Sequence, residues 1–319
     1  MKIKFIINPT AGNGQALKTQ DRIHRILDNT DHFFSIEKTS APREATHMAQ
    51  KAVAEKYDAV VAVGGDGTIF EVINGMAGSD VLLGIIPAGT GNDLARTAGI
   101  PRAVNEALQM ILQPHVSPID IGRLNGKYFV NVASIGFDAQ VVQQCNHMKK
   151  FASGPLPYVL SVLKTLIGYK NKHYKILLDG KLLEREILLI SIANGKYYGG
   201  GMMIAPDAVL DDGYFDVCII NKMSKFRILT LFPTIFKGTH IRLPEVEYFK
   251  AKHIKIFANN MIINCDGEIV SNIPVDFSMA DFKLNLIVNK RVKNPAHQSI
   301  TSMLYGSTEN SGQCPIEIH

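Results

Sequence analysis

The chain has 319 residues, of which 46% are hydrophobic and 20% are charged, and this balance excludes a mainly disordered protein. The formal net charge of +5 favours an anionic partner, but it is too small to indicate nucleic acid, and no basic block with interleaved aromatic residues is present. A chain of this length can form two domains, each with its own core.

The cysteines and the apolar segments narrow the choice of compartment. Cys145, Cys218, Cys265 and Cys314 show no CxxC spacing, so they predict neither a disulfide framework nor a zinc site and fit a reducing environment. The apolar run at residues 3–7 is too short for a signal peptide, and no stretch approaches the roughly 20 apolar residues that span a bilayer. We expect a cytoplasmic protein that contacts membranes only peripherally.

The first third of the chain alternates strands and helices. Apolar, β-rich runs predict strands, and helical spacing predicts helices between them. The strands are expected at residues 4–8, 33–37, 58–63 and 81–86, and the helices at 16–27, 43–56, 69–76 and from Leu94 onward. Strands separated by helices of this length indicate βαβ units and a parallel sheet. We therefore expect an α/β nucleotide-binding domain over residues 1–124.

The pattern changes near Asp120 to β-rich segments joined by hairpin signals. These signals lie at residues 178–181, 259–260 and 265–268. Only two helices, at 157–169 and 225–236, are expected among them. We expect an antiparallel β-sandwich over residues 125–289, with a last strand that could return to the first domain. Residues 290–319 are assigned to the end of this return segment and to a tail that frays.

A glycine-rich loop stands where the third predicted strand ends and a helix begins. It consists of Gly64, Gly65, Asp66, Gly67 and Thr68, at the edge where parallel sheets bind ligands. Glycines let the backbone approach a phosphate, and the amides of a helix N-terminus favour an anion. A carboxylate there would repel a bare phosphate, so Asp66 indicates a Mg²⁺ ion or a hydroxyl to be oriented. The alternative is a tight turn in which Asp66 caps the helix.

Two further loops follow other predicted strands. The loop at residues 87–93, Pro-Ala-Gly-Thr-Gly-Asn-Asp, has the same small, glycine-flanked character, so the two loops together can hold a polyphosphate. Asp93 could equally cap the next helix. The loop at residues 8–14 fails the dinucleotide fingerprint, because Leu17 stands where a glycine belongs, and it lacks the Gly-Lys-Ser/Thr of a P-loop.

Together these loops resemble the catalytic domain of the diacylglycerol kinase family, which includes bacterial lipid kinases and is similar to sphingosine and ceramide kinases. The matching stretches are residues 8–12, residues 64–68 with Glu71 and Asn74, and residues 87–93. Gly-Gly-Asp-Gly alone is shared with NAD kinases and phosphofructokinases. The Pro-x-Gly-Thr-x-Asn-Asp loop favours the lipid kinases.

The resemblance implies that ATP binds between the two domains. The residues that it assigns to the nucleotide are Asn8, Pro9, Thr10, Ala11, Gly12, Thr39, Gly64, Gly65, Asp66, Gly67, Thr68, Ile69, Phe70 and Thr90. Asp66 is also a candidate catalytic residue. Thr39 could instead simply end a strand.

Asp-Gly-Glu at residues 266–268 matches the catalytic acids of the family. Phosphoryl transfer requires a base near the acceptor hydroxyl and a divalent ion, and either Asp266 or Glu268 could accept the proton. Asp-Gly between β segments is also a strong hairpin signal that needs no chemistry. The match around these residues favours the catalytic interpretation.

An acidic turn at residues 205–214 implies, through the same resemblance, a structural Mg²⁺ ion. Asp212 would bind the ion together with groups at Val209 and Tyr214, and Val209 can offer only its backbone carbonyl. Closely spaced oxygen ligands suit Mg²⁺, and a polar β-turn without metal is the alternative. A second glycine loop, at residues 194–201, could admit a lipid head group or form a hairpin tip.

Two helical segments, at residues 155–169 and 222–242, combine apolar side chains with basic flanks. This pattern suits an anionic membrane surface, although such helices more often pack on a sheet. We predict an ATP- and Mg²⁺-dependent lipid kinase that phosphorylates diacylglycerol at such a surface. A NAD kinase and a non-catalytic nucleotide- or lipid-binding regulator are the alternatives. The acyl chains, the preference for ATP over GTP and self-association as a homodimer stay open.

Overall fold

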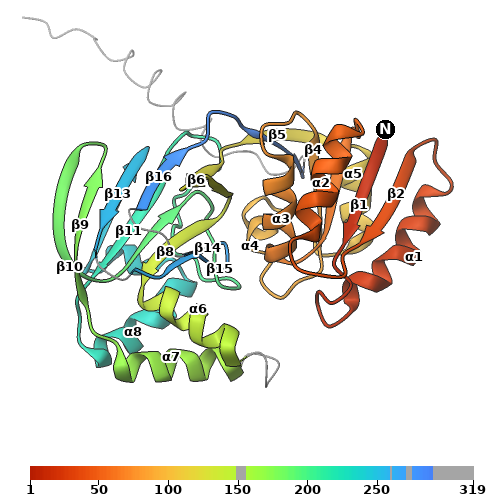
Figure 1. The fold of residues 1–319 in the computed structure, drawn as a ribbon. Helices are drawn as coiled ribbons and strands as arrows, with labels where there is room; N and C mark the ends of the chain where they lie inside the picture. The colour runs from red at the N-terminus through yellow and green to blue at the C-terminus, as the bar shows by residue number, and fades with distance from the viewer. Residues whose placement is uncertain (149–155, 259–260, 271–274, 290–319) are drawn as a thin grey trace, which may run out of the picture.

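The computed structural model describes residues 1–148, 156–258, 261–270 and 275–289, which form two domains side by side (Figure 1). The predicted turn at residues 259–260 and the predicted tail at 290–319 lie outside the described residues. Within those residues, no helix is long and apolar enough to cross a bilayer.

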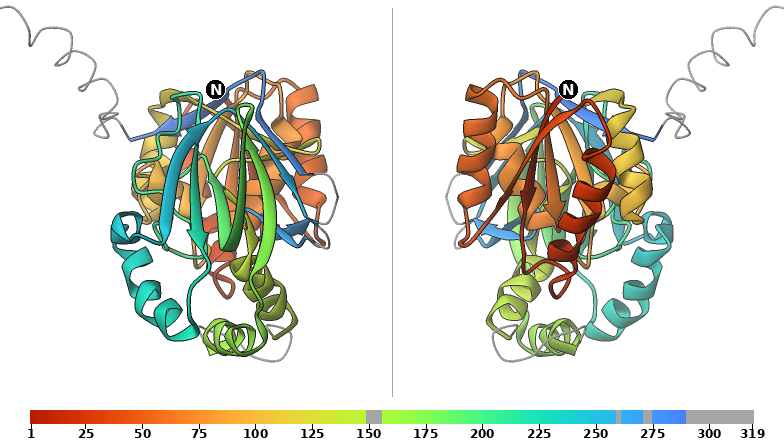
Figure 2. Two further views of the ribbon diagram at one scale, coloured as in Figure 1. Left: turned by 90° about the vertical axis from the view of Figure 1, so that its left-hand side faces the viewer. Right: turned by 90° about the vertical axis from the view of Figure 1, so that its right-hand side faces the viewer.

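The N-terminal domain is a six-stranded sheet in the order β2-β1-β3-β4-β17-β5, covered by helices on both faces (Figure 2). The strands are parallel except β5, which runs antiparallel to β17. Every strand and helix predicted here is present. The elements are β1 (Lys2–Ile7), α1 (Gln15–Leu27), β2 (Phe33–Lys38), α2 (Glu44–Ala54), β3 (Ala59–Gly64), α3 (Asp66–Met76), β4 (Leu82–Pro87), α4 (Asp93–Thr97), α5 (Val104–Leu112) and β5 (His115–Ile119).

The position of the central strand β3 in the fold explains why its sequence is continuously apolar. All its residues are buried. Val61 and Val63 pack in the cluster beneath α1 and α5, whereas Val60 and Ala62 pack in the cluster beneath α2 and α3. A strand covered on both faces gains from apolar side chains at every position. Its carboxyl end therefore emerges from a rigid core directly at the glycine-rich loop.

The C-terminal domain is an eleven-stranded antiparallel sheet folded into a sandwich. The long strand β10 pairs with β9 in its first half and with β8 and β11 in its second half, after a register shift. The elements are β6 (Gly122–Leu124), β7 (Lys127–Phe129), β8 (Val132–Gly136), α6 (Phe137–Met148), α7 (Leu156–Gly168), β9 (Lys172–Leu178), β10 (Lys181–Ala193), β11 (Phe215–Asn221), α8 (Lys225–Phe236), the 3₁₀ helix η1 (Thr239–Arg242), β12 (Val246–Ala251), β13 (His253–Phe257), β14 (Ile263–Cys265), β15 (Glu268–Val270) and β16 (Val275–Met279).

The helix α6 was not predicted, so the expectation of only two helices in this half is wrong. Its β-branched residues Val141 and Val142 fit a strand equally well, and only the burial of Phe137, Val141 and Cys145, which are four residues apart, shows the helical face. The helices α6, α7 and α8 gather at one end of the sandwich (Figure 1). Of the three, α6 contacts β14 and β15, the strands of the predicted acidic hairpin.

The chain crosses between the two sheets twice. It leaves the first sheet after β5 and enters the second at β6, so this change of sheet precedes the expected boundary at residues 124 and 125. It returns through β17 (Leu284–Val288), which lies between β4 and β5. The expected return of the last strand is confirmed. Since β17 completes the first sheet, it does not belong to the sandwich although it lies within residues 125–289.

Candidate active site

Three loops meet at the carboxyl edge of the N-terminal sheet, backbone against backbone. A Cβ atom on Gly89 would overlap the Cα of Gly65, and one on Gly12 would overlap the carbonyl oxygen of Ala88. Gly12 also has a φ of 59°, which favours glycine. The loops after β1, β3 and β4 can pack this closely only because glycine stands at these contacts.

Polar side chains fix the shape of this edge. Asn8 Nδ2 donates to Thr68 Oγ1 at 3.2 Å, and Asn8 Oδ1 accepts hydrogen bonds from the amide and hydroxyl of Thr10 at 3.1 and 2.8 Å. The amide of Thr39 donates to Ile7 at 2.9 Å, which places Thr39 beside the end of β1. The structure therefore brings these predicted nucleotide residues together.

Other predicted nucleotide residues differ in what their side chains can reach. Thr90 is exposed in the loop after β4. Ile69 is buried in the core of the N-terminal domain, and Phe70 packs against the core of the sandwich. Ile69 can therefore offer a nucleotide only backbone groups, whereas Phe70 is partly buried.

Asp66 joins two of the loops. Its carboxylate oxygens accept hydrogen bonds from the amides of Asn92 and Asp93 at 2.9 and 2.7 Å. The carboxylate thus caps α4 rather than its own helix α3. The sequence suggested a cap on the adjacent helix as one alternative, but the helix that Asp66 caps begins after the next strand.

Asp93 connects these loops of the N-terminal domain to the second domain. Its side chain is buried, and its Oδ2 accepts a hydrogen bond from the amide of Gly200 at 2.9 Å. Burial, and then the nearby charge of Asp66, raise the pKa of Asp93 to about 6. The glycine loop at residues 194–201 is therefore in direct contact with the carboxyl edge of the N-terminal sheet. Because the nucleotide is predicted to bind there, we call it the nucleotide edge.

The predicted acidic hairpin is present between β14 and β15. Asp266 and Gly267 have φ values of 48° and 92°, as a two-residue turn with two positive φ angles requires. The Asp266 carboxylate accepts hydrogen bonds from three successive backbone amides, those of residues 130–132, at 2.8 to 3.3 Å. Burial raises the pKa of Asp266 to about 7, although the three amide donors act to lower it.

Glu268 differs from Asp266 in its exposure and in the direction of its side chain. It is exposed and lies across the gap between the domains from the start of α3, where a Cβ on Gly67 would be 4.0 Å from its Oε1. The hairpin thus directs one acid into the fold and the other toward the glycine-rich loop.

The acidic turn at residues 207–214 is held from two sides. Asp212 accepts a hydrogen bond from the amide of Tyr214 at 3.0 Å and pairs with Lys250 at 2.6 Å. Asp120 accepts a hydrogen bond from the amide of Gly213 at 2.7 Å. Within the part of the chain that the structure describes, no three His, Cys, Asp or Glu residues gather as a metal-binding group.

Two protein-family models match the chain along its length. Residues 2–124 match the diacylglycerol kinase catalytic domain, and residues 131–288 match the YegS C-terminal NAD kinase beta sandwich-like domain. The chain is 34% identical over 280 residues to a diacylglycerol kinase of Bacillus subtilis (strain 168), covering 86% of this chain and 92% of that protein. The chain belongs to the diacylglycerol kinase family.

Further relatives agree with this membership. A diacylglycerol kinase of Mycobacterium tuberculosis (strain ATCC 25618 / H37Rv) is 33% identical over 294 residues, which is 90% of this chain and 94% of that protein. A solved structure described as a putative diacylglycerol kinase from Bacillus anthracis str. Sterne has a TM-score of 0.75 and 30% identity, covering 92% of this chain and 98% of that chain. The protein is a lipid kinase with ATP as its co-substrate, and the expected family and two-domain fold class are confirmed.

Two residues that match the diacylglycerol kinase pattern make hydrogen bonds that stabilise the fold. Glu71 accepts hydrogen bonds from the amides of Arg43 and Ala45 at 2.9 and 3.2 Å, so it caps α2. Asn74 exchanges two hydrogen bonds with the backbone of Tyr128 at 2.9 and 3.1 Å, and this contact joins the domains. A match to a family pattern therefore does not by itself place a residue at the nucleotide.

Sequence reasoning missed three residues of the kinase that brace the site. Asn194 donates to the carbonyls of Asp120 and Val130 at 2.9 and 3.0 Å. Lys250 neutralises Asp212 from the neighbouring strand β12, and Asp120 holds the acidic turn. No local pattern could have found them, because their partners lie in distant parts of the chain.

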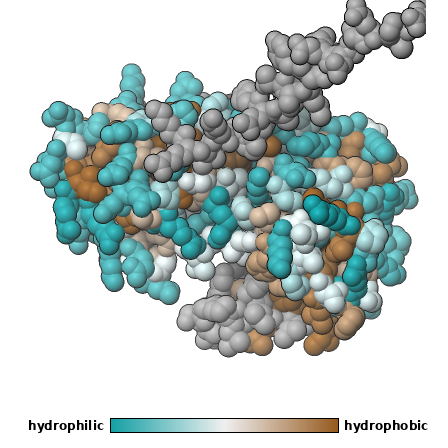
Figure 3. Space-filling view, turned by 180° about the vertical axis from the view of Figure 1, so that it is seen from behind, coloured by the Kyte–Doolittle hydropathy of each residue, from teal (hydrophilic) through white to brown (hydrophobic). Residues whose placement is uncertain are grey.

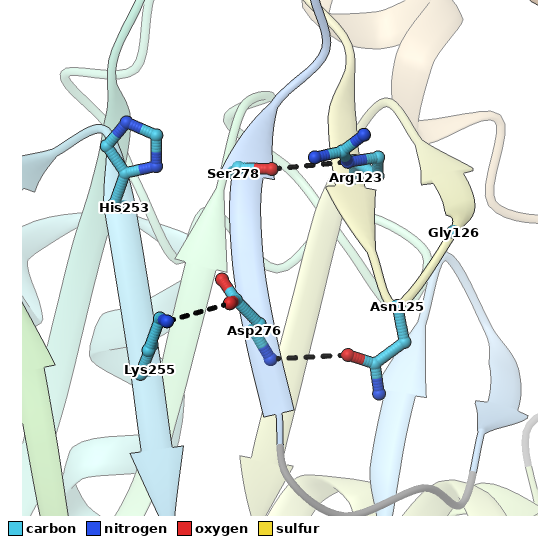
Figure 4. Close-up of a pocket in the computed structure, with 7 residues that line it drawn as sticks. All are labelled: Arg123, Asn125, Gly126, His253, Lys255, Asp276 and Ser278. Carbon is cyan, nitrogen blue, oxygen red and sulfur yellow. Dashed lines mark hydrogen bonds and ion pairs between the residues drawn. The ribbon is translucent and has the colours of Figure 1, made fainter.

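A polar groove of about 550 Å³ lies elsewhere on the kinase, along β6, β13 and β16 (Figure 4). Lys255 pairs with Asp276 at 3.2 Å, and Arg123 Nε donates to Ser278 at 3.3 Å. Lys255 and Asp276 are thus engaged with each other, and Arg123 is engaged with a neutral hydroxyl. The groove is several strands away from β14 in the sheet and is separate from the candidate active site.

Proposed function

We propose that the kinase transfers the γ-phosphate of ATP to the free hydroxyl of diacylglycerol, giving phosphatidic acid and ADP, with Glu268 as the general base. The observation that carries this proposal is the difference between the two acids of the hairpin. A base must reach the acceptor hydroxyl. Glu268 is exposed toward Gly67, whereas the oxygens of Asp266 are occupied by backbone amides.

The phosphates of ATP would lie along the edge formed by residues 8–12 and 64–70, with Thr39 and Thr90 at its sides. Because Gly12 and Gly65 have no Cβ, the backbones of these loops come close together, and the first amides of α3 offer an anion-binding end. In this arrangement Asp66 acts by holding the amides of α4 in place. It is a positioning group for the nucleotide edge.

A Mg²⁺ ion fits the donors of the acidic turn. The Asp212 carboxylate and the backbone carbonyls of Val209 and Tyr214 are all oxygen ligands, which Mg²⁺ prefers. Lys250 already neutralises Asp212 at 2.6 Å, so the ion would compete with this ammonium group. When bound, the ion would supply positive charge that braces the turn.

An anionic membrane surface is the proposed source of the lipid. The helices α7 and α8 bury one face each, but their other faces expose large apolar side chains, with Ile167 and Phe226 each 77% exposed. Lys164 and Lys225 are exposed beside them. Figure 3 shows hydrophobic surface at the lower edge of the C-terminal domain, in the region of these helices. Apolar side chains with basic neighbours suit such an interface.

The substrate is tested by transfer of labelled phosphate from ATP to mixed micelles that contain diacylglycerol, run beside undecaprenol, a long-chain base and NAD. We expect label in phosphatidic acid with the wild type and none with Glu268→Gln. Label in NAD alone would support a NAD kinase, and nucleotide binding without any transfer would support a regulator. Both outcomes contradict the proposal.

The membrane surface is tested by sedimentation with vesicles of phosphatidylcholine, with and without phosphatidylglycerol. We expect the double variant Ile167→Ala/Phe226→Ala to bind anionic vesicles less than the wild type. Leu182→Ala is the matched control, because Leu182 is 54% exposed on β10. Equal loss in both variants would show that the two helices have no special part in binding.

A further inference from the structure

The hairpin that carries the proposed base is short and lies at the edge of its sheet. Its strands β14 and β15 have three residues each, and among the described residues β15 pairs only with β14. Figure 1 shows β15 on the side of the sandwich that faces the N-terminal domain. A two-stranded hairpin of this length is at best marginally stable without further contacts. The direction of Glu268, the first residue of β15, therefore depends on what holds the turn.

The side chain of Asn264 closes this turn from within. Asn264 is only 3% exposed, and its Oδ1 accepts a hydrogen bond from the amide of Gly267 at 3.0 Å. Because a backbone amide can only donate, the oxygen of the Asn264 amide group has to face Gly267. Gly267 has a φ of 92° and no side chain of its own to fix the turn. The contact thus fixes the residue directly before Glu268.

The other end of this side chain is anchored in the core of the sandwich. Asn264 Nδ2 donates to Ser134 Oγ at 3.3 Å, and Ser134 is fully buried on β8, directly opposite Asn264. On its other side β8 pairs with the long strand β10, so the position of Ser134 is fixed by the sheet. A buried amide group needs partners for its donor and for its acceptor. Asn264 has one partner in the core and the other in the turn.

Asn264 and Asp266 hold the two turn residues in different ways. The Asp266 carboxylate binds the amides of residues 130–132, which ties this residue to the segment that leads into β8. Asn264 instead holds the amide of Gly267. With both contacts, each of the two residues between the strands has its own attachment to the fold. Glu268 follows them and is exposed, so the turn sets the direction of its side chain.

We infer that Asn264 is a positioning residue of the kinase, which directs Glu268 into the gap between the domains by fixing Gly267 against Ser134. Asn264 is buried and acts through the hairpin, without touching nucleotide or lipid. For its kinetic consequence this inference rests on the proposed function, because it takes Glu268 as the base. The two hydrogen bonds themselves do not depend on that function.

The kinetic test compares Asn264→Leu with Asn264→Asp. Leucine has a similar size but no acceptor, so we expect kcat to fall by about 10- to 100-fold, with the KM for ATP changed by no more than about twofold, because a misplaced base affects mainly the chemical step. Aspartate keeps an acceptor for the Gly267 amide, and the Ser134 hydroxyl can rotate to donate to it. Asn264→Asp should therefore restore kcat to within about fivefold of wild type.

Ser134→Ala and Ser191→Ala form a matched pair that remains informative if Asn264→Leu fails to fold. Both serines are fully buried, and they stand opposite each other on β8 and β10. Ser134 binds the side chain of Asn264, whereas Ser191 donates to the carbonyl of Cys218 at 3.5 Å. We expect kcat to be about 3- to 10-fold lower in Ser134→Ala and unchanged in Ser191→Ala. Circular dichroism at the assay temperature must show that each compared variant is folded.

Hydrogen exchange gives a measurement that needs no substrate. In Asn264→Leu the amide of Gly267 loses its acceptor, so we expect faster exchange in residues 264–268, with the N-terminal domain and Ser191→Ala unchanged. Four results each overturn the inference: wild-type kcat in folded Asn264→Leu, an Asn264→Asp variant no more active than Asn264→Leu, equal kcat in the two serine variants, or uniformly faster exchange. If wild type transfers no phosphate to any lipid, the proposed function fails, whereas exchange in residues 264–268 still tests the contact.

Discussion

The nucleotide edge and the acceptor side of this kinase are built in opposite ways. At the edge of the N-terminal sheet, the proposed nucleotide site is formed by the backbones of short, contiguous, glycine-rich segments. On the proposed acceptor side, the hairpin that carries Glu268 is held by side chains whose partners lie far away in the chain: Asp266 accepts hydrogen bonds from the amides of residues 130–132, and Asn264 donates to Ser134. The comparison teaches that a backbone-built site can be recognised as a motif, whereas a side-chain-built site requires the fold.

The largest expected effect separates the two acids of the hairpin. Glu268→Gln should lower kcat by about 10²- to 10⁴-fold, as expected for loss of a general base, with no change in melting temperature. Asp266→Asn should lower the free energy of unfolding by about 2–4 kcal/mol, because its amide group cannot accept all the bonds from residues 130–132. Steady-state kinetics and thermal melting measure both. If the two variants lose the same kcat and the same stability, the different roles assigned to the two acids are wrong.

The next effect concerns the pH dependence of stability. Because burial raises the pKa of Asp138 from 3.8 to about 6, the folded state binds this proton more tightly than the unfolded state. Its contribution is fully present below about pH 4 and is lost as the pH rises through 6, by about 3 kcal/mol at most. Asp138→Asn should therefore lose less unfolding free energy than wild type between pH 4 and pH 7. If urea denaturation gives the same pH dependence of the unfolding free energy for both proteins, this assignment is contradicted.

A smaller effect tests the backbone contact at the nucleotide edge. Gly12→Ala introduces a Cβ that overlaps Ala88 at a φ of 59°, so it should destabilise the fold by about 2 kcal/mol and raise the KM for ATP. Gly14→Ala is the control, since Gly14 has a φ of 83° but open space around it. It should cost only about 1 kcal/mol and leave the KM unchanged. Equal KM values in the two variants would show that the close approach is not used.

The smallest effect tests the acidic turn. Saturating Mg²⁺ should raise the unfolding free energy of wild type by about 1 kcal/mol through preferential binding to the folded state. Asp212→Ala should abolish this increase, whereas Asp207→Ala, at an exposed position of the same turn, should keep it. Thermal melting with and without Mg²⁺ measures the difference. An unchanged increase in Asp212→Ala would place the ion elsewhere.

Much of the fold follows from the sequence because its signals are local. Continuous apolar runs marked β3 and β4, and Asp-Gly pairs marked the turns before β10 and β15, where positive φ angles are required. The helix α6 was missed because Val141 and Val142 suit either periodicity. Its helical face is decided by the packing of α6 against the sandwich, not by its own residues.

The site was predictable only in part, for the same reason. Residues 8–12, 64–68 and 87–93 were recognised in advance and do meet at one edge. The sequence could not choose between Asp266 and Glu268, because the choice depends on amides at residues 130–132.

The position of β17 has a consequence for how the protein is synthesised. Among the described residues, β5 pairs only with β17, and β17 is synthesised after all the other described strands. Until then the nascent first domain carries an open edge on β4 and an unpaired β5, and such edges invite pairing with other chains. The two domains are therefore expected to reach their native state together once β17 has been synthesised, so truncation anywhere before Leu284 should give aggregates.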